Sequence, residues 1–522
     1  MKIRILNLLV ICCLLLIGCQ KSKIIFYDPP KSEKISNDFE MFVNNKPVFV
    51  YKATVSKFPV NQIWPGYQRP KDQTESASFA YFDFEGEVTL KIISTKKIKT
   101  IDIRPKEYGI EPSVKGDIIE FKLTKPSQFV VEVNGYHHAL HVFANSIEDY
   151  NIDKEAPNVQ YFGPGVHDVG MIDLKSNETV YIDGGAIVYG VIQSKNTNNV
   201  KILGRGILDA SKIERGKAPN LISLEKVKNA TISGITLRDA HQWAVVTTNC
   251  DSIEIDNIKL IGFWRYNSDG IDIVNSKNIS VSNSFIRSFD DNIAIKGLNS
   301  AYNENYKNIE NILIDKCVLW NDWGRAIEIG AETVADTVKN ITFSNCQIVH
   351  FTAIAMDIQN SDKGVVKNIK FKNISIEDPI SDSLMIGNMF ISPKAWGKIA
   401  VLGIYGSFYS HNSARGNISN VFYNNIKYHS KNIFPVLQLD IDPSHIEKNM
   451  AFENYNTFIR DNIYFGDIDF TSKSNALMFL SGYDSLHTVH DIYIDNFLIN
   501  GEKVTDMNLI GRNKFVKNIF MK

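Results

Sequence analysis

The stretch that decides the fold runs from Asn267 to Gly297 and reads NSDGIDIVNSKNISVSNSFIRSFDDNIAIKG. It holds three short alternations of apolar and polar residues, which begin at Ile271, Ile279 and Ile293. This period of two is typical of a β-strand, and the Asn, Ser, Asp and Gly residues between the alternations are those of tight turns. The stretch therefore predicts short strands joined by turns, with no helical segment.

The same unit, Asn-Ile followed by alternating apolar residues, recurs along the chain, which indicates a repeat architecture. Most starts are 23 to 33 residues apart, the length of one coil of a parallel β-helix. Two gaps of 49 and 45 residues indicate either inserted loops or a coil whose start does not match the pattern. Asn suits the turns because it tolerates a left-handed backbone. The starts are Asn199, Asn229, Ser252, Asn278, Asn311, Asn340, Asn368, Asn417, Asn462 and Asp491.

Three cysteines remain beyond the N-terminal segment. Cys317 and Cys346 each lie 6 residues past a repeat start, and Cys250 is the third. An odd number excludes a complete disulfide framework, and no CxxC spacing suggests a metal site. We therefore expect Cys317 and Cys346 to be small apolar groups in an interior column, with no metal and no cofactor.

The part of the chain before the repeat has a different pattern. Residues 36–148 alternate apolar and polar positions in several runs, separated by Asn-Asn, Gly-Glu and Asn-Gly turn signals. An antiparallel β-sandwich is the best interpretation. The predicted fold is all-β, with an N-terminal β-sandwich at 20–155 followed by a parallel β-helix at 156–522.

The first residues predict export. A basic start is followed by an apolar run too short to span a bilayer comfortably, and the run ends in Leu16-Ile17-Gly18-Cys19. This sequence resembles a bacterial lipobox, so residues 1–19 are interpreted as a lipoprotein signal and Cys19 as the lipidated residue. A plain cleaved signal or a membrane anchor is the alternative. We expect a chain held in the bacterial cell envelope by a lipid anchor.

The balance of positive and negative charge limits the classes of binding partner. The 522 residues carry 57 Lys and Arg against 58 Asp and Glu, a net charge of −1. That balance gives no general attraction to nucleic acid or to an anionic membrane surface. We expect a monomer that acts on a polysaccharide or oligosaccharide.

The stretch from Asn267 to Gly297 also contains acidic residues that neighbouring coils would bring together. If Ile271 and Ile273 align with Ile293 and Ile295, Asp269 stacks on Asp291 with Asp290 beside it. The next coil, aligned through Ile327 and Ile329, then places Arg325 above Asp291 and Glu328 nearby, with Asp357 over Glu328. Carboxyl groups this close push one pKa upward, which yields an acid beside bases. Glycoside hydrolysis uses such a pair.

The motifs Asn267-x-Asp269 and Asp290-Asp291 resemble those of polygalacturonase-type enzymes (glycoside hydrolase family 28) and of the related dextranase-type family 49. The resemblance implies a right-handed parallel β-helix and hydrolysis with inversion. It implies that Asp290 is the general acid and that Asp269 and Asp291 are the bases that hold the water. The family 28 motifs Gly-His-Gly and Arg-Ile-Lys are missing, and Trp323–Gly330 stands in place of the first. Because those Arg and Lys residues hold a uronate, we expect a neutral or only partly charged α-linked polysaccharide.

Aromatic and polar residues near these acids are candidates for sugar contacts. Trp rings on neighbouring coils suit stacking on sugars, and Trp320 belongs to this aromatic group. The predicted substrate-binding residues are His241, Trp243, Trp264, Asn267, Lys296, Trp323, Arg325 and Glu328.

Two alternatives remain open. A polysaccharide lyase on the same fold would need a uronate and a cation such as Ca²⁺, which Asp269, Asp291 and Glu328 could hold with Arg325 as the base. A β-helix that only binds glycans at the cell surface is the other alternative.

Overall fold

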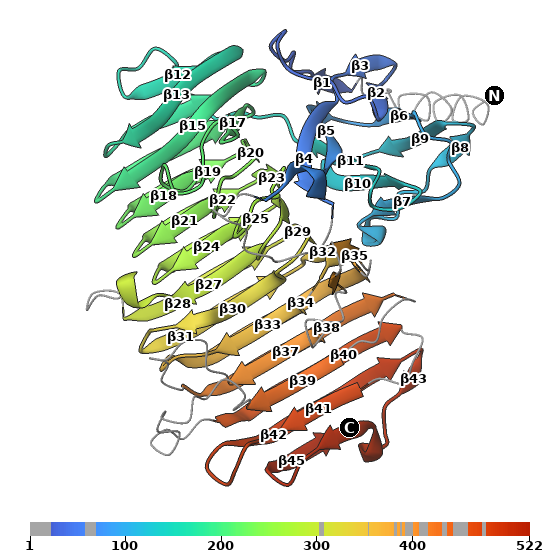
Figure 1. Cartoon of the computed structure of the whole chain (residues 1–522), viewed down its shortest axis with the longest axis vertical. Helices are drawn as coiled ribbons and strands as arrows, with labels where there is room; N and C mark the ends of the chain where they lie inside the picture. The colour runs from blue at the N-terminus through green and yellow to red at the C-terminus, as the bar shows by residue number, and fades with distance from the viewer. Residues whose placement is uncertain are drawn as a thin grey trace, which may run out of the picture.

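A computed structural model of the chain describes residues 22–57, 69–301, 307–352, 354–380, 384–386, 389–391, 400–406, 416–430, 436–441, 458–471 and 477–522. Strands dominate these residues, and their few helices are single 3₁₀ turns: η2 (Lys71–Gln73), η3 (Lys106–Tyr108), η4 (Asn299–Ala301) and η8 (Met507–Leu509). The predicted fold class is confirmed: a β-sandwich stands beside the upper coils of a long parallel β-helix (Figure 1).

The sandwich consists of two sheets whose inner faces share one apolar core. The predicted strands are present, but the antiparallel prediction needs one correction, because β11 pairs with β5 in parallel. One sheet contains β1 (Lys23–Ile25), β4 (Tyr51–Ser56), β5 (Thr74–Glu85), β7 (Ile101–Arg104), β10 (Ser127–Val133) and β11 (Ala139–Asn145). The other contains β2 (Phe39–Val43), β3 (Lys46–Val48), β6 (Val88–Ser94), β8 (Ser113–Lys115) and β9 (Ile118–Leu123).

The β-helix winds three stacks of parallel strands around an apolar interior. Right-handed crossover is the strongly preferred way to connect parallel strands. The first stack is β12 (Val159–Phe162), β14 (Thr179–Ile182), β16 (Asn198–Gly204), β19 (Lys228–Ser233), β22 (Asp251–Asp256), β25 (Lys277–Ser282), β28 (Asn308–Asp315), β31 (Thr337–Ser344), β34 (Val365–Pro379), β38 (Ile418–His429), β40 (Phe458–Thr471), β42 (Thr488–Ile499) and β45 (Val516–Met521).

The second stack lies against the sandwich, and the third completes each coil. The long strands β13 (Gly165–Leu174) and β15 (Ala186–Lys195) begin both. The second continues through β17 (Ile207–Asp209), β20 (Thr236–Arg238), β23 (Lys259–Ile261), β26 (Phe285–Ser288), β29 (Val318–Asn321) and β32 (Gln347–Phe351). The third continues through β18 (Ile222–Glu225), β21 (Val245–Thr248), β24 (Ile271–Val274), β27 (Ile293–Gly297), β30 (Arg325–Thr333), β33 (Ile354–Asn360), β37 (Ala400–Gly406), β39 (Val436–Ile441), β41 (Leu477–Ser481) and β44 (Ile510–Arg512). Short antiparallel additions are β35 (Leu384–Ile386) with β36 (Met389–Ile391), and β43 (Glu502–Lys503) on β42.

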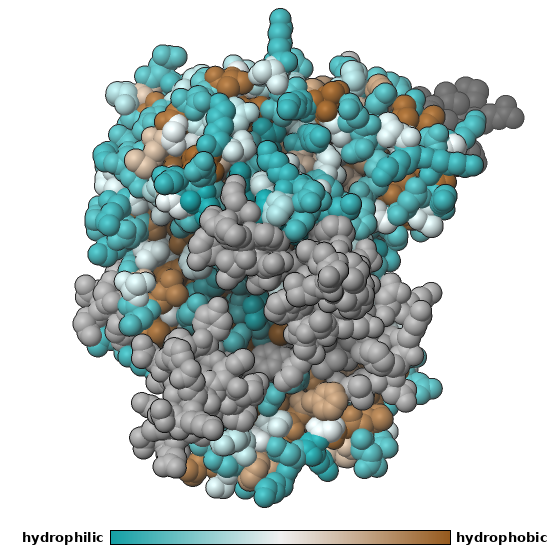
Figure 2. Space-filling model, viewed as in Figure 1, coloured by the Kyte–Doolittle hydropathy of each residue, from teal (hydrophilic) through white to brown (hydrophobic). Residues whose placement is uncertain are grey.

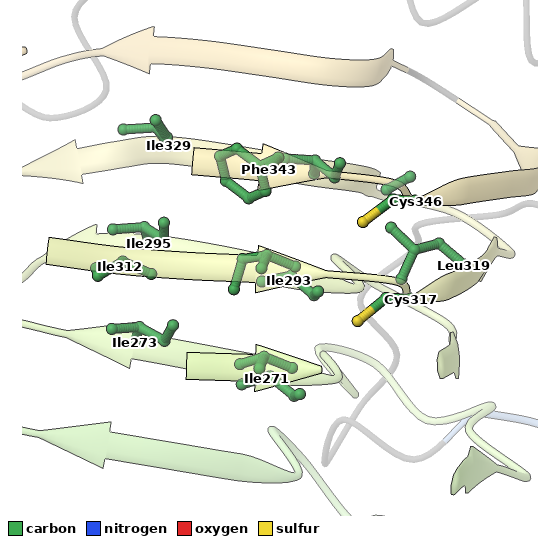
Figure 3. Packing of buried hydrophobic residues seen from close by; sticks show 14 of the residues in the cluster. Ile271, Ile273, Ile293, Ile295, Ile312, Cys317, Leu319, Ile329, Phe343 and Cys346 are labelled. Atoms are coloured by element: carbon green, nitrogen blue, oxygen red, sulfur yellow. The ribbon is translucent and has the colours of Figure 1, made fainter. Parts of the chain in front are cut away.

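Equivalent apolar residues stack in columns inside the β-helix (Figure 3). Ile271 lies beneath Ile293, and Ile273 lies beneath Ile295. The Cys317 and Cys346 side chains are neighbours in this interior, and both are free thiols, as the sequence predicted. Column packing of this kind fixes the register of every coil, because a slip of one residue would turn the interior set outward.

Asparagine ladders support the turns. The Asn311 side chain donates to Asn278 at 3.0 Å, and Asn340 donates to Asn311 at 3.2 Å, with left-handed backbones at all three. The predicted repeat start at Asn417 is wrong by three residues, because Asn420 has the left-handed backbone and accepts from Asn462. In the sequence, Asn417 is followed by Ile and so matches the repeat pattern, whereas the true start, Asn420, is followed by Val421.

The coloured side chains on the face in Figure 2 are mostly hydrophilic, with hydrophobic ones in small groups. Within the described ranges, no helix is long and apolar enough to cross a membrane. The predicted lipoprotein signal and Cys19 lie outside the described residues.

Candidate active site

The pairing of strands places the acids on adjacent coils. Ile271 pairs with Ile293 and Ile293 with Ile327, so the register expected from the sequence is confirmed. Asp269 lies near the end of the loop from β23 to β24, and Asp290 and Asp291 lie in the equivalent loop from β26 to β27. The Gly270 N–H donates to the Asp291 carbonyl at 2.8 Å, which binds one loop to the next.

A glycine on the following coil covers both adjacent acids. A Cβ on Gly324 would lie 2.4 Å from Asp291 Oδ1 and 2.5 Å from Asp290 Oδ1. These two carboxyl oxygens are therefore less than about 5 Å apart. Only glycine fits at this position without displacing an acid.

Asp290 has the properties of an acid near neutral pH. Burial, and then the charge of Asp291, raise the pKa of Asp290 to about 7. The Asn267 side-chain amide donates to Asp290 Oδ2 at 3.3 Å, and Arg215 donates to Asn267 Oδ1 at 3.0 Å. Because a guanidinium can only donate, it fixes the amide with its NH₂ group toward Asp290. The sequence pattern marked Asn267 but gave no signal for Arg215, which comes from a loop two coils away.

Asp291 is the carboxylate that remains ionised. Burial alone would raise its pKa, but a hydrogen bond from Glu328 and nearby positive charges lower it below the usual range. The Arg325 backbone N–H donates to Asp291 Oδ1 at 2.8 Å, and Lys296 Nζ lies 3.8 Å from Asp291 Oδ2. Adjacent residues on one bend therefore have pKa values pushed in opposite directions.

Lys296 is the buried cation of the cluster. Its Nζ lies 2.9 Å from Asp269 Oδ2 and 2.9 Å from Asp272 Oδ1, and it sits 4.3 Å from the centre of the Trp243 ring. Burial raises the pKa of both Asp269 and Asp272, and the charge of Lys296 opposes that rise. Sequence analysis did not include Asp272 among the site residues.

A second group lies on the next two coils. Glu328 pairs in register with Asp357, and Arg325 Nε lies 3.5 Å from Asp357 Oδ2 and 3.9 Å from Glu328 Oε1. Burial raises the pKa of Glu328 and raises that of Asp357 to about 7. Arg325 also donates to Gln359 at 3.3 Å, and its side chain is 32% exposed. The alternation on β24, β30 and β33 was the signal for Asp272 and Asp357, since it puts them in one outward column with Glu328.

Two predicted sugar contacts, His241 and Trp264, and the neighbouring Trp320 are buried and make structural contacts. His241 is fully buried, and its Nε2 bonds the Pro219 carbonyl oxygen at 2.9 Å. Trp264 is 4% exposed, donates to Asp239 at 3.0 Å and lies against Arg265. Trp320 is fully buried against Arg287 on the side that faces the sandwich. The sequence places these rings near the acids but does not reveal which side of the coil each one faces.

The other candidates lie close to the acids. Trp243 is partly buried against Lys296, Trp323 is 7% exposed, and Asn267, Lys296, Arg325 and Glu328 surround the three acids as described above. Among the described residues, no group of three or more His, Cys, Asp and Glu side chains has the geometry to hold a metal ion. The arrangement offers one protonated carboxyl group beside one carboxylate, which is the chemistry of general acid–base catalysis.

Comparison with known proteins agrees with this geometry. Residues 170–400, which include all of these acids, match the family described as glycosyl hydrolases family 28. The resemblance to family 28 is confirmed. An endo-polygalacturonase of Pectobacterium parmentieri is 30% identical over 165 residues, which are 31% of this chain and 38% of that protein. An exopolygalacturonase of Arabidopsis thaliana is 25% identical over 178 residues, or 32% and 39% of the two chains. The chain thus spans less than half the length of these relatives.

One solved structure matches nearly the whole chain. Dex49A from Penicillium minioluteum has a TM-score of 0.58 at 15% identity, and the match covers 95% of this chain and 96% of the other. At that identity the likeness shows the fold alone, and it extends over both the sandwich and the β-helix.

Proposed function

We propose that the chain is an exported glycoside hydrolase that cleaves an α-linked polysaccharide with Asp290 as the general acid. The observation that carries this proposal is the contrast between neighbours: the pKa of Asp290 is about 7, and that of Asp291 is below its usual range. Glycoside hydrolysis requires this division between one protonated and one ionised carboxyl group.

The reaction follows from these two protonation states. Asp290 donates its proton to the glycosidic oxygen as the bond to the anomeric carbon breaks. Asp291, with Asp269 beside it, accepts a proton from the water that attacks that carbon, so the sugar gains the hydroxyl and the leaving sugar gains the proton. The Asn267 amide orients the Asp290 carboxyl group, and the Lys296 ammonium group offsets negative charge on Asp269 and Asp291.

We propose that the water attacks from the face opposite the leaving group, with inversion. The family resemblance supports this stereochemistry. The Asp290 and Asp291 oxygens are closer than the roughly 6.5–9.5 Å between the carboxyl groups of a typical inverting pair. Asp269 therefore has to share in placing the water. Proton NMR of the first-formed product tests this directly, because an anomer of retained configuration would contradict it.

The substrate is proposed to be neutral or only partly charged. Six carboxyl groups face two cations in this cluster, so a uronate would meet mainly acidic side chains; they are Asp269, Asp272, Asp290, Asp291, Glu328 and Asp357. The partly exposed Arg325 and the neighbouring Gln359 offer donors to sugar hydroxyls. Reducing-end release from a panel of polysaccharides is the test. Dextran-type and other neutral α-glucans should be cleaved, and strong activity on polygalacturonate would contradict the substrate proposal.

We further propose that Cys19 carries lipid and anchors a monomeric enzyme in the bacterial cell envelope. The lipobox-like Leu16-Ile17-Gly18-Cys19 supports the anchor. Labelled palmitate should enter the protein in cells and should fail to enter a Cys19→Ala variant. Equal labelling of both would contradict the anchor, and light scattering of the chain without residues 1–19 checks the monomer.

A further inference from the structure

One residue of the sandwich contacts the bend that carries the proposed general acid. Arg69 stands just before η2, at the base of the connection between β4 and β5, which lie on the side of the sandwich that packs against the β-helix (Figure 1). Its guanidinium carbon lies 4.7 Å from the centre of the Phe289 ring. Because Phe289 immediately precedes Asp290, this contact joins the sandwich to the residue next to the acid.

The Arg69 side chain is held in place by the sandwich itself. It is 2% exposed, and it donates to Ser56 at 2.6 Å and to Gln73 at 3.4 Å. Burial lowers the pKa of Arg69 to about 10, which leaves the guanidinium charged at neutral pH. A cation over an aromatic face is attracted to it, and the attraction is stronger where water is excluded. Arg69 is therefore a fixed and charged partner for the ring.

Phe289 lies outside the apolar interior of the β-helix. Its ring is fully buried, yet within the described ranges it does not belong to the interior columns, which include Ile286 and Ile293 of the same coil. The coil therefore does not bury this ring in its own core. Arg69 covers the ring instead, so the burial of Phe289 links the bend to the sandwich.

The β-helix holds the same bend through its backbone. Ser288 Oγ and Asn321 Nδ2 each donate to the Asp290 carbonyl oxygen at 2.7 Å. The Gly324 N–H donates to the Phe289 carbonyl oxygen at 3.4 Å. These bonds fix two carbonyl groups, and the contact with the sandwich fixes the side chain between them. A bend held from both sides matters because an acid must stay close to its productive geometry.

Other contacts of the sandwich lie away from this bend. Arg104 bonds Glu377 on β34, three coils beyond β26 in the same stack. At about 4.8 Å per coil, that contact is roughly 14 Å further along the β-helix. Gln128 donates to the Asn283 carbonyl oxygen at 2.9 Å, on the coil of Phe289 but at the opposite end of β26. Of these three sandwich residues, Arg69 is the one that meets the bend of the acid.

We propose that Arg69 is a positioning residue for Asp290, so that the β-sandwich completes the active site of the β-helix. Arg69 acts through Phe289 and touches no reacting atom. The inference rests on the proposed function, since it takes Asp290 as the general acid. It gives the sandwich a part in catalysis, in addition to covering one side of the β-helix.

Turnover of a cleaved polysaccharide by the full-length enzyme tests this link. Arg69→Met should lower kcat about tenfold with KM little changed, because a small displacement of a catalytic group is costly while the substrate contacts remain. Phe289→Leu should do the same. The double variant should lose no more than either single variant, because the two residues act through one contact. Arg69→Lys keeps the cation and should restore most of the activity.

The matched control is Gln128→Met, which also removes a contact between the sandwich and this coil, at the other end of β26. It should leave kcat unchanged. Thermal unfolding midpoints within a few degrees establish that the variants fold. An unchanged kcat in Arg69→Met, an equal loss in the control, or losses that multiply to about a hundredfold in the double variant would overturn the positioning role.

An infrared titration gives a readout that needs no turnover. The carboxyl band of Asp290 is isolated by subtracting the spectrum of the same protein with Asp290→Asn. In Arg69→Met its midpoint should lie about one pH unit below that of wild type, since a loosened bend admits water and burial is the main cause of the raised pKa of Asp290. Loss of the Arg69 charge alone would move the midpoint upward. The other charged groups that act on Asp290 are the same in both proteins; they are Asp291, Lys296, Arg325 and Asp272.

The two readouts separate this inference from the proposed function. An unchanged or raised midpoint in Arg69→Met would overturn the positioning role. Failure of the wild-type enzyme to cleave any glycan would instead overturn the proposed function, while the infrared midpoint would still decide whether Arg69 holds Asp290 in place.

Discussion

Two carboxyl groups of this molecule are almost equally buried and have opposite properties. Glu132, at the contact of sandwich and β-helix, is 2% exposed, and Asp290, at the acid cluster, is 8% exposed. Although burial opposes its charge, His350 and Arg104 lower the pKa of Glu132 to about 2. Burial and Asp291 raise the pKa of Asp290 to about 7. Burial therefore does not decide the role of an acid here; the balance of neighbouring charge does.

The sandwich contact is a row of paired charges. Arg104 lies 3.0 Å from Glu132 and 2.5 Å from Glu377. Arg205 lies 3.0 Å from Asp83, and Arg287 lies 3.1 Å from Asp322. At the acid cluster, carboxyl groups outnumber the cations Lys296 and Arg325. We infer that the first arrangement orders the two parts of the chain and that the second favours the protonated form of several carboxyl groups, Asp290 among them.

The largest expected effect comes from removing the acid. Asp290→Asn should lower kcat by about 10²–10⁴-fold, the usual contribution of a general acid. The variant should keep its fold, because Asn has the same shape. It should even be more stable than wild type above pH 7, since a raised pKa means that stability is lost as pH rises through about 7. Kinetics and thermal unfolding at pH 5 and pH 9 measure both effects. Retained turnover would remove Asp290 from the mechanism.

The second change breaks the paired region. Arg104→Met leaves Glu132 and Glu377 buried without their cation, which should reduce the free energy of unfolding by about 3–5 kcal/mol. Denaturant unfolding near pH 7 measures the loss. The pH optimum of any surviving folded enzyme should stay unchanged, because the contact does not reach the acids. A shifted optimum with undiminished stability would contradict the division between the two regions.

The third change removes the central cation of the acid cluster. Lys296→Met should raise the pKa of Asp291, because Lys296 helps to hold it down. The acid limb of the kcat/KM profile should then move to higher pH. At a fixed pH below the new limb, kcat/KM should fall about tenfold for each pH unit by which the limb has moved. Lys296→Arg keeps the charge and should restore part of the activity. An unchanged acid limb would show that Asp291 does not carry the base function.

The smallest effect concerns the orientation of the acid. Without Arg215, the Asn267 amide is free to turn its oxygen toward Asp290 and accept a hydrogen bond from the protonated carboxyl group, which then points away from the leaving group. Arg215→Met should therefore lower kcat about three- to tenfold, the worth of one net hydrogen bond, with KM little changed. Arg215→Lys, which can still donate, is the matched control. Equal losses in both variants would argue for a merely steric role.

The β-helix and the clustering of the three acids could be predicted from the sequence, because both depend on the register between neighbouring coils. The alternation around Ile271 and Ile293 fixes which residues point inward, and the adjacent turns then bring Asp269 and Asp291 together. The sequence could not predict the role of Arg215, whose loop crosses two coils. It also could not distinguish Trp243 from the buried Trp264, because packing between coils decides which way each ring points. The docking of the sandwich, which buries Trp320 and His350, also has no signature in a local pattern.

At the pH of catalysis, Asp290 is expected to be protonated while Asp291 is ionised. Infrared difference spectra between wild type and Asp290→Asn, recorded across a pH titration, isolate the carboxyl stretch of Asp290. The protonated band should be present at pH 5 and disappear with a midpoint of about 7, matching the alkaline limb of kcat. A band already absent at pH 5 would mean that Asp290 is ionised like Glu132, and that it cannot be the acid.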